Sequence, residues 1–379
     1  LPPTLFSDLL INGVVAGLGG ILVFVPQIMV LFGIITLLED SGYMARISFL
    51  SDKLMRSVGL NGKSVMPMIS GFACAVPAIM SARNIENRKE RLLTILITPL
   101  MSCSARLPVY TTITALVIPN EYLFGILSIQ GLVLLAMYVA GVILALAVSY
   151  VANLFIKIKE KSFFILELPT YRSPRWGNLL PTMLGKAKIF VLDAGKVIMI
   201  ISLVLWGLSS YGPGARMQAI EKNYQSALVI PGADTARIEK EFHAAKLENS
   251  YAGLIGKQLE PAIAPLGFDW RIGIALVTSF AAREVFVGTM ATLFSVGDDT
   301  DDSLLNEKLK AAVRPNGTPL FTLATGLSLM IFYVFAMQCM STLAVVKRET
   351  KSWKWPTIQL VYMTGLAWLL SWIVYLIFS

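Results

Sequence analysis

Three cysteines carry most of the chemistry that this sequence could perform. Cys74, Cys103 and Cys339 each lie in an otherwise apolar run. Their neighbours are small or carry hydroxyls, as at Ser102, Ser104, Ser341 and Thr342. A buried cysteine taken alone is more often a small apolar residue than a ligand. Thiolates beside hydroxyls at membrane depth, however, indicate a path for a borderline ion such as ferrous iron, which binds sulfur better than calcium or magnesium does.

Three carboxylates could supply oxygen ligands along the same path. Glu39 and Asp40 end the first apolar run, where they mark either an interfacial helix end or an acidic mouth that attracts a cation. Glu284 lies in the middle of another apolar run beside Arg283, and a carboxylate at such a depth is by default a functional candidate. The structural alternative is an ion pair with Arg283 or another basic group. The predicted metal ligands are Cys74, Cys103, Cys339, Glu284, Glu39 and Asp40.

Three further motifs are expected to carry no chemistry. Residues 61–64 resemble the end of a P-loop, but Ser57 stands where the loop requires glycine, so no nucleotide site is expected. The acidic run 298–302 lacks the spacing of a calcium-binding loop. His243, the sole histidine, lies in a mixed-charge stretch and is expected on the surface. Because no nucleophile and base stand at a usable spacing, the sequence does not predict an enzyme.

The composition places the chain in a membrane. Hydrophobic residues make up 55% and charged residues 15% of its 379 residues, and the mean hydropathy is +0.68. A soluble domain carries about 25% charged residues. The net charge of +8 does not require a nucleic-acid partner, because Lys and Arg collect on the cytoplasmic side of membrane proteins. Three cysteines in apolar surroundings exclude a disulfide framework, and no signal peptide is apparent.

Six apolar segments are long enough to cross a bilayer of about 30 Å. They are 9–38, 92–118, 122–156, 189–211, 319–346 and 356–378. Two more apolar stretches, 64–82 and 272–296, are interrupted by proline, glycine or charge, which predicts re-entrant hairpins buried in protein. Arg106, two residues before Pro108, is expected to bind carbonyl groups that the proline frees from helical hydrogen bonding.

Basic residues orient these segments. Nineteen of the Lys and Arg residues lie in 39–63, 83–91, 156–188 and 347–354. Only nine lie in 212–269 and 297–318. The positive-inside rule makes the first group cytoplasmic and both termini extracytoplasmic, and an N-terminus there predicts that an upstream part is missing. The polar segment 212–269, with a helical pattern near 234–250, is then a small extracytoplasmic helical insertion.

The predicted fold is an all-α polytopic membrane protein with two inverted repeats. One half reads helix, hairpin, helix over 9–38, 64–82 and 92–118. The other reads the same way, in the opposite orientation, over 189–211, 272–296 and 319–346. Cys103 and Cys339 fall in the helix after each hairpin. Inverted repeats whose discontinuous elements meet near the midplane are typical of transporters.

Five motifs in this order resemble the ferrous iron transport protein B (FeoB) family of bacteria. They are LEDSGYMAR at 38–46, GFACAVPAIM at 71–80, MSCSARLP at 101–108, AREVFVGT at 282–289 and CMSTLA at 339–344. The resemblance covers essentially the whole chain and implies two Gate regions, with all three cysteines on family positions. In the implied division, residues 1–155 form the first Gate half, and residues 189–211 together with 270–346 form the second. Residues 156–188 are a cytoplasmic connection, 212–269 the insertion and 347–379 the C-terminal span.

The resemblance also implies partners. Family members begin with a cytoplasmic GTP-binding domain, a helical regulatory domain and a membrane helix, none of which is visible in this sequence. The expected function is permeation of Fe²⁺ across the bacterial inner membrane, regulated by that GTP-binding domain and by small FeoA-like cytoplasmic proteins. Oligomerisation with further copies stays open, as do Mn²⁺, Co²⁺ and Zn²⁺ as cargo. The alternatives are a Gate-type transporter of an organic solute such as a nucleoside, and a membrane scaffold without transport.

Overall fold

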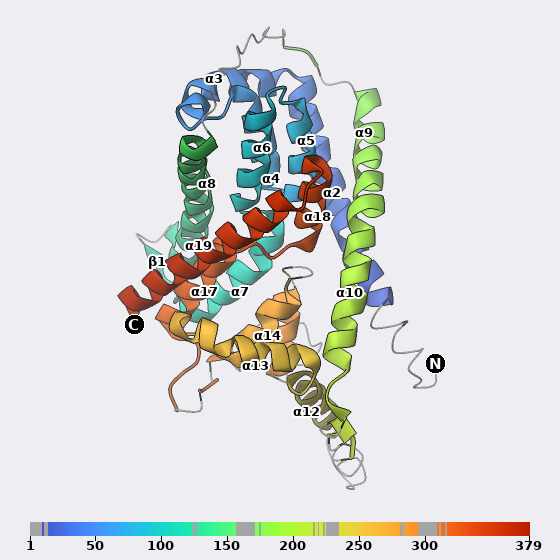
Figure 1. Ribbon diagram of the computed structural model, residues 1–379, viewed down its shortest axis with the longest axis vertical. Helices are drawn as coiled ribbons and strands as arrows, with labels where there is room; N and C mark the ends of the chain where they lie inside the picture. Colours follow the sequence, from blue (N-terminus) through green and yellow to red (C-terminus); the bar gives the residue numbers. More distant parts are fainter. Residues whose placement is uncertain are drawn as a thin grey trace.

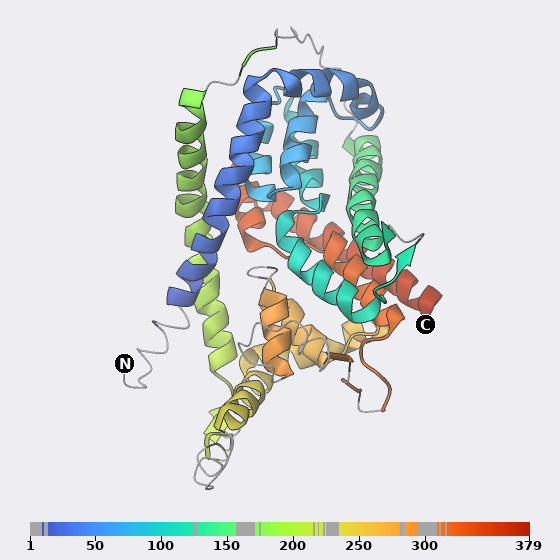
Figure 2. The same cartoon turned by 180° about the vertical axis from the view of Figure 1, so that it is seen from behind.

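In the computed structural model, the secondary structure of the described residues is helical apart from one short strand pair and an isolated β-bridge between Val313 and Pro319 (Figures 1 and 2). The structure describes residues 10, 14–123, 127–156, 171–173, 176–214, 217–218, 220–222, 224, 235–280, 283, 285–294, 309–310, 312–314 and 317–379. Among these residues, four helical stretches are long and apolar enough to cross a membrane, or five if the bent helix pair Val25–Asp40 and Tyr43–Ser57 counts as one span. The four are Arg88–Val117, Ile129–Leu154, Leu323–Thr350 and Lys354–Phe378. These stretches correspond to four of the six predicted spans.

The first predicted span, 9–38, is partly described as α2 (Ala16–Asp40), which meets α3 (Tyr43–Ser57) at an angle of 81°. Gly42 forms this corner with φ of 79°, a value that glycine adopts without strain. Helix α3 is amphipathic: Phe49, Leu50 and Leu54 are exposed, while Met44 and Met55 are buried. It lies across one end of the molecule, over the ends of the shorter helices that follow (Figure 1).

Two short helices then occupy the segment 64–82, for which a re-entrant hairpin was predicted. They are α4 (Val65–Gly71) and α5 (Ala75–Ser81), between the 3₁₀ turns η2 (Gly62–Ser64) and η3 (Ala82–Asn84). The second predicted hairpin, 272–296, contains α14 (Trp270–Thr278) and α15 (Val285–Leu293). In both pairs the two helices pack against each other, and each helix is too short to cross a bilayer by itself.

The predicted spans 92–118 and 319–346 are not continuous helices. The first consists of α6 (Arg88–Ile97), η4 (Thr98–Leu100), η5 (Ser104–Arg106) and α7 (Leu107–Val117), and the second of α17 (Leu323–Phe335) and α18 (Met340–Thr350). Pro99 explains the first break, because it offers no N–H to the carbonyl four residues before it. No proline lies in the second break, where Ala336 and Cys339 are extended.

The remaining helices differ from the predicted bounds at their ends. The span predicted at 122–156 begins with the strand pair β1 (Tyr122–Leu123) and β2 (Leu127–Ser128) and becomes helical only in α8 (Ile129–Ile156). Helix α9 (Trp176–Ile189) continues through a π-helical turn (Phe190–Ala194) into α10 (Gly195–Ser210), so the helix of the second half begins earlier than residue 189. Figures 1 and 2 show α9 beside α2 in both views.

The described part of the polar segment 212–269 includes the helices α12 (Thr235–Glu248) and α13 (Tyr251–Ile263), and α14 follows. The helix predicted near 234–250 is therefore confirmed, and His243 is exposed on it as expected. These helices lie at the end of the molecule opposite α3 (Figure 1).

The last helix is α19 (Lys354–Phe378), which packs along α17. The acidic run 298–302, which was not expected to bind calcium, lies outside the described residues.

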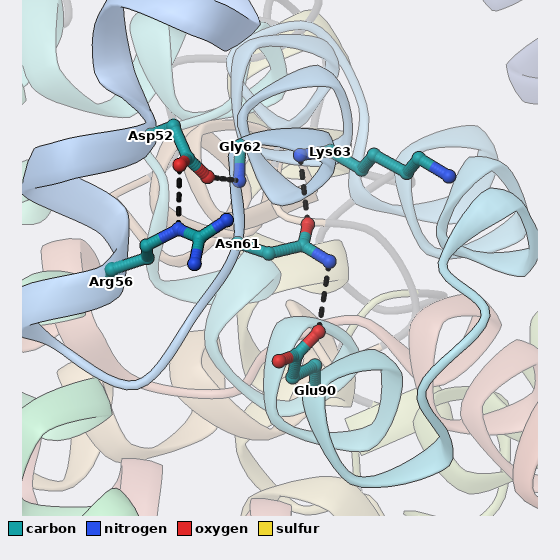
Figure 3. A network of polar contacts seen from close by, with 6 residues as sticks. All are labelled: Asp52, Arg56, Asn61, Gly62, Lys63 and Glu90. Carbon is teal, nitrogen blue, oxygen red and sulfur yellow. Dashed lines mark hydrogen bonds and ion pairs between the residues drawn. The ribbon is translucent and has the colours of Figure 1, made fainter. Parts of the chain in front are cut away.

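A polar network explains the motif at 61–64 that resembles a P-loop (Figure 3). The Asn61 side chain accepts the backbone N–H of Lys63 at 2.8 Å and donates to the buried Glu90 carboxylate at 2.8 Å. Asp52 on α3 accepts the backbone N–H of Gly62 at 2.8 Å and pairs with Arg56. The motif therefore caps the start of the first hairpin and joins α3 to α6.

Candidate functional site

The three cysteines line one cavity of about 730 Å³ between the two halves of the chain. Each stands at a helix break: Cys74 immediately before α5, Cys103 before η5 and Cys339 before α18. All three are free thiols and are partly exposed. The backbone is extended at each of them, with φ of −153°, −85° and −153° in this order. The sequence prediction that these cysteines share one site is thus consistent with the geometry.

Hydroxyl groups accompany the thiols. Ser104, Ser341 and Thr342 line the same cavity. The Ser104 hydroxyl donates to the Ala73 carbonyl at 3.0 Å, which ties the broken span α6–α7 to the break in the first hairpin. Ser102 points elsewhere: it is fully buried and lies 3.4 Å from the Tyr110 hydroxyl. The cavity wall therefore offers sulfur and hydroxyl oxygen among mostly apolar side chains.

The buried side chain of Arg106 stabilises the first break by hydrogen bonds to backbone carbonyls. It is 1% exposed, and its guanidinium donates to the Pro99 carbonyl at 3.0 Å, with longer contacts to the Leu100 carbonyl at 3.5 Å and the Ser102 hydroxyl at 3.4 Å. The predicted role of Arg106 is confirmed in kind, but the carbonyls that it binds precede the break and are not those beside Pro108. An arginine can serve several carbonyls at once because its guanidinium carries five N–H groups.

Arg283 has the same role in the second break. It is 5% exposed, lines the cavity, and donates to the Tyr333 carbonyl at 3.0 Å and to the Ala336 carbonyl at 2.9 Å. Both carbonyls lie at the C-terminal end of α17, where four helical carbonyls lose their partners. Among the described residues no carboxylate pairs with Arg283. The alternative of an ion pair with Glu284 concerns a residue outside the described ones.

The predicted carboxylate ligands are not gathered around the cysteines. Glu39 is exposed and Asp40 half-buried at the end of α2, and neither lines the cavity, although their neighbour Leu38 does. Glu284 lies outside the described residues. Within the part of the chain that the structure describes, no three Cys, His, Asp or Glu side chains form a group that could hold a metal ion. The three thiols therefore line one cavity without forming such a group among the described residues.

Sequence reasoning missed two groups near the cysteines. The Gln338 side chain is 3% exposed, and its Oε1 accepts no hydrogen bond from the described residues. Gln359 on α19 is fully buried and donates to the Leu96 carbonyl at 2.9 Å and to the Ile95 carbonyl at 3.4 Å. The Tyr362 hydroxyl also donates to the Leu96 carbonyl, at 2.5 Å. The available signal was an amide inside an apolar run, which requires a partner when it is buried.

Comparison with known proteins identifies two family models along the chain. The Gate model, described as nucleoside recognition, matches residues 21–117 and 191–353. A model described as the ferrous iron transport protein B C terminus matches residues 134–186. Each of the two Gate stretches contains one of the short-helix pairs and one of the broken spans. No solved structure matches the chain significantly.

Curated relatives share this region at substantial identity. An Fe(2+) transporter FeoB of Leptospira biflexa is 45% identical over 370 residues, which are 97% of this chain and 50% of the relative. One of Staphylococcus aureus is 42% identical over 97% of the chain and 49% of the relative. A fusion of Fe(2+) transport protein A with FeoB from Porphyromonas gingivalis is 36% identical over 99% of the chain and 45% of the relative. The chain thus spans about half the length of these relatives.

Proposed function

From its membership of the ferrous iron transport protein B (FeoB) family, whose transmembrane Gate region it represents, we propose that the chain conducts Fe²⁺ across a bacterial inner membrane. The observation that carries this proposal is the convergence of Cys74, Cys103 and Cys339 from three separate helix breaks on one cavity. Cysteines that served only as small apolar packing residues could lie anywhere along a helix. These three each lie at a helix break, which favours a role as ligands.

The position of the thiols at three separate helix breaks fits transport better than storage. An ion that must leave again requires weak and incomplete coordination at successive positions. A closed set of thiolates would hold a soft or borderline ion tightly. In the proposed path Fe²⁺ passes from one cysteine to the next, with Glu284 as an oxygen ligand from the second hairpin. Glu39 and Asp40, at the end of α2, form the acidic mouth.

The order of the helices supports two inverted halves. In the first half α4–α5, the broken span α6–α7 and α8 follow one another, and in the second half α14–α15, the broken span α17–α18 and α19 follow in the same order. We infer that the two short-helix pairs are re-entrant hairpins of opposite orientation. Movement of one half against the other would then alternate access to the cavity.

The basic segments assign the sides of the membrane. Helix α3, from the basic segment 39–63, lies at one end of the molecule, and we infer that this end faces the cytoplasm. The insertion with α12 and α13 then lies on the opposite side. A GTP-binding domain elsewhere in the whole protein would regulate the path from the cytoplasm. A regulator like Fe(2+) transport protein A would act from the same side, as the Porphyromonas gingivalis fusion suggests.

Iron uptake by cells that express the whole protein tests the thiol path. Each of C74S, C103S and C339S should lower the initial rate of ⁵⁵Fe²⁺ uptake about tenfold, because a hydroxyl is a poor substitute for a thiolate ligand. Thr111→Ser, an equally small change on the exposed face of α7, serves as the control and should transport normally. Normal uptake by all three cysteine variants, at equal abundance in the membrane, would exclude the proposed path.

An organic solute is the second candidate, because the Gate model is described as nucleoside recognition. A nucleoside needs several amide or carboxylate partners, and the described lining of the cavity provides Gln27, Arg283 and three hydroxyls. The names of the relatives favour iron. Proteoliposomes that accumulate labelled nucleoside but not Fe²⁺ would reverse this choice.

A further inference from the structure

A second cavity, of about 640 Å³, lies away from the cysteines where α6, α18 and α19 meet. Basic residues dominate its wall: Arg88, Lys89 and Arg91 come from the first turn of α6, and Lys351 follows the end of α18. The other lining residues are Leu92, Ile95, Glu349, Thr350 and Trp355. We call these nine residues the basic pocket.

Its positive charge is not neutralised from within. Glu349 is the sole acid of the lining, and it accepts two hydrogen bonds from Arg83 at 2.6 and 2.7 Å and lies 3.6 Å from Arg348. Within the described residues Arg88, Arg91 and Lys351 form no ion pair. Glu90, although adjacent in sequence, is buried against Asn61 on the other side of α6. The basic pocket therefore attracts an anion from outside the chain.

The backbone at Lys351 adds an independent observation. Its φ is +52°, which makes it the one non-glycine residue with positive φ among the described residues. Helices usually end in this conformation with glycine or asparagine, because a Cβ atom is strained there. A lysine at this point places a long cation over the pocket at the expense of local stability. Strain of this kind is more common at binding sites than elsewhere.

The apolar part of the lining identifies the class of anion. Leu92 and Ile95 continue down α6 below the basic turn, and Trp355 lies in the first turn of the predicted span α19. Ile358 and Val361 follow on α19 with 39% and 66% of their surfaces exposed. A basic rim that passes into an apolar wall along a spanning helix suits a molecule with an anionic head and hydrocarbon chains.

We propose that the basic pocket binds the phosphate of an anionic phospholipid, whose acyl chains follow α19 into the bilayer. A free phosphate would gain nothing from the apolar wall. An acidic protein segment would not need a position at the start of a spanning helix. The site is distinct from the cysteine cavity and does not depend on which solute that cavity conducts.

Native mass spectrometry of the purified whole protein in detergent measures this binding directly. Titration with phosphatidylglycerol should show one tight lipid, and phosphatidylcholine should bind much more weakly. The double variant Arg91→Gln with Lys351→Gln should bind phosphatidylglycerol about 30-fold more weakly, since each basic residue near an anionic lipid contributes about a factor of five. The control Lys53→Gln with Arg172→Gln removes the same charge from exposed residues outside the pocket and should bind normally.

Lys351→Gly separates a lipid contact from a structural role. Glycine relieves the backbone at φ of +52°, so the protein should melt no lower than the parent while its affinity for phosphatidylglycerol falls about fivefold. Equal binding of both lipids, or equal loss in the control, would overturn the proposal. Full displacement of the lipid by millimolar inorganic phosphate would instead identify a site for the free anion and would equally overturn the assignment to a lipid.

Discussion

The contact between α19 and the broken span allows a sharp test of how the fold tolerates its breaks. Pro99 removes the N–H that would bind the Ile95 carbonyl, and the carbonyls of Ile95 and Leu96 turn instead to α19. Gln359 donates to both, at 3.4 and 2.9 Å, and Tyr362 donates to the Leu96 carbonyl alone. The Leu96 carbonyl therefore has two donors, and loses its last partner only when both are removed.

This redundancy sets the expected magnitudes. Tyr362→Phe should lower the free energy of unfolding by about 1 kcal/mol, the net value of one hydrogen bond. Gln359→Met should cost about 1–2 kcal/mol, because it takes the side-chain donor from the Ile95 carbonyl, although it also removes the Gln359 Oε1, a buried acceptor without a partner among the described residues. The double variant leaves the Leu96 carbonyl unpaired and should exceed the sum of the single effects by about 1–2 kcal/mol.

Thermal unfolding of the protein in detergent measures all three variants, and each kcal/mol corresponds to a shift of roughly 2 °C or more in a chain of this size. Val361→Ala, a truncation on the exposed side of α19, is the control and should show no coupling with Tyr362→Phe. Additive effects of Gln359→Met and Tyr362→Phe would refute the shared-acceptor argument. So would a loss above about 3 kcal/mol for Gln359→Met alone.

Three more predictions concern stability, each measured by the melting temperature in detergent. Gly256→Ala should destabilise by about 1–3 kcal/mol, because the added methyl would lie 2.5 Å from a side-chain carbon and 2.8 Å from a backbone nitrogen of α14; Gly177→Ala, with open space around it, should not. Asn61→Ala should cost about 3 kcal/mol, since it removes a helix cap and the hydrogen bond to the buried Glu90; an unchanged melting temperature would contradict the network in Figure 3. Lys351→Gly should raise stability by about 0.5 kcal/mol through relief of its positive φ, and a loss would show that the lysine side chain supports the fold.

The sequence predicted the helices better than their interruptions. Hydrophobic runs of about 20 residues are a direct consequence of bilayer thickness, so four of the predicted spans agree with long helical stretches. The sequence predicted that Pro108 interrupts the helix in 92–118, but it did not predict the breaks that begin at Thr98 and after Phe335, because the apolar pattern continues through them. At each break, backbone carbonyls lose their helical hydrogen bonds and accept N–H groups of Arg106 or Arg283 instead. Which arginine reaches which carbonyl becomes evident only in the three-dimensional structure.

The candidate site was predicted unevenly for a related reason. The cysteines stand in runs that small residues and prolines mark as irregular, and the structure brings all three to one cavity. Glu39 and Asp40 were predicted as ligands because they lie at the end of an apolar run. That position indicates how deep they lie in the membrane but not which way their side chains point, and neither lines the cavity. An ion pair between Arg283 and Glu284 was the structural alternative that the sequence left open, but a buried arginine is equally satisfied by backbone carbonyls, and the sequence does not distinguish these partners.

The two buried arginines also have a consequence for which ions the path admits. Alkali metal ions shed their water in proteins when rings of backbone carbonyls replace it. Here the carbonyls of Pro99, Tyr333 and Ala336, which the broken helices would otherwise offer, already accept guanidinium N–H groups. Sodium and potassium therefore find no substitute for their hydration shell at these breaks, whereas sulfur remains available to a softer ion. Bilayers that contain the protein should accordingly show no potassium or sodium current, and such a current would mean that the guanidinium groups leave their carbonyls.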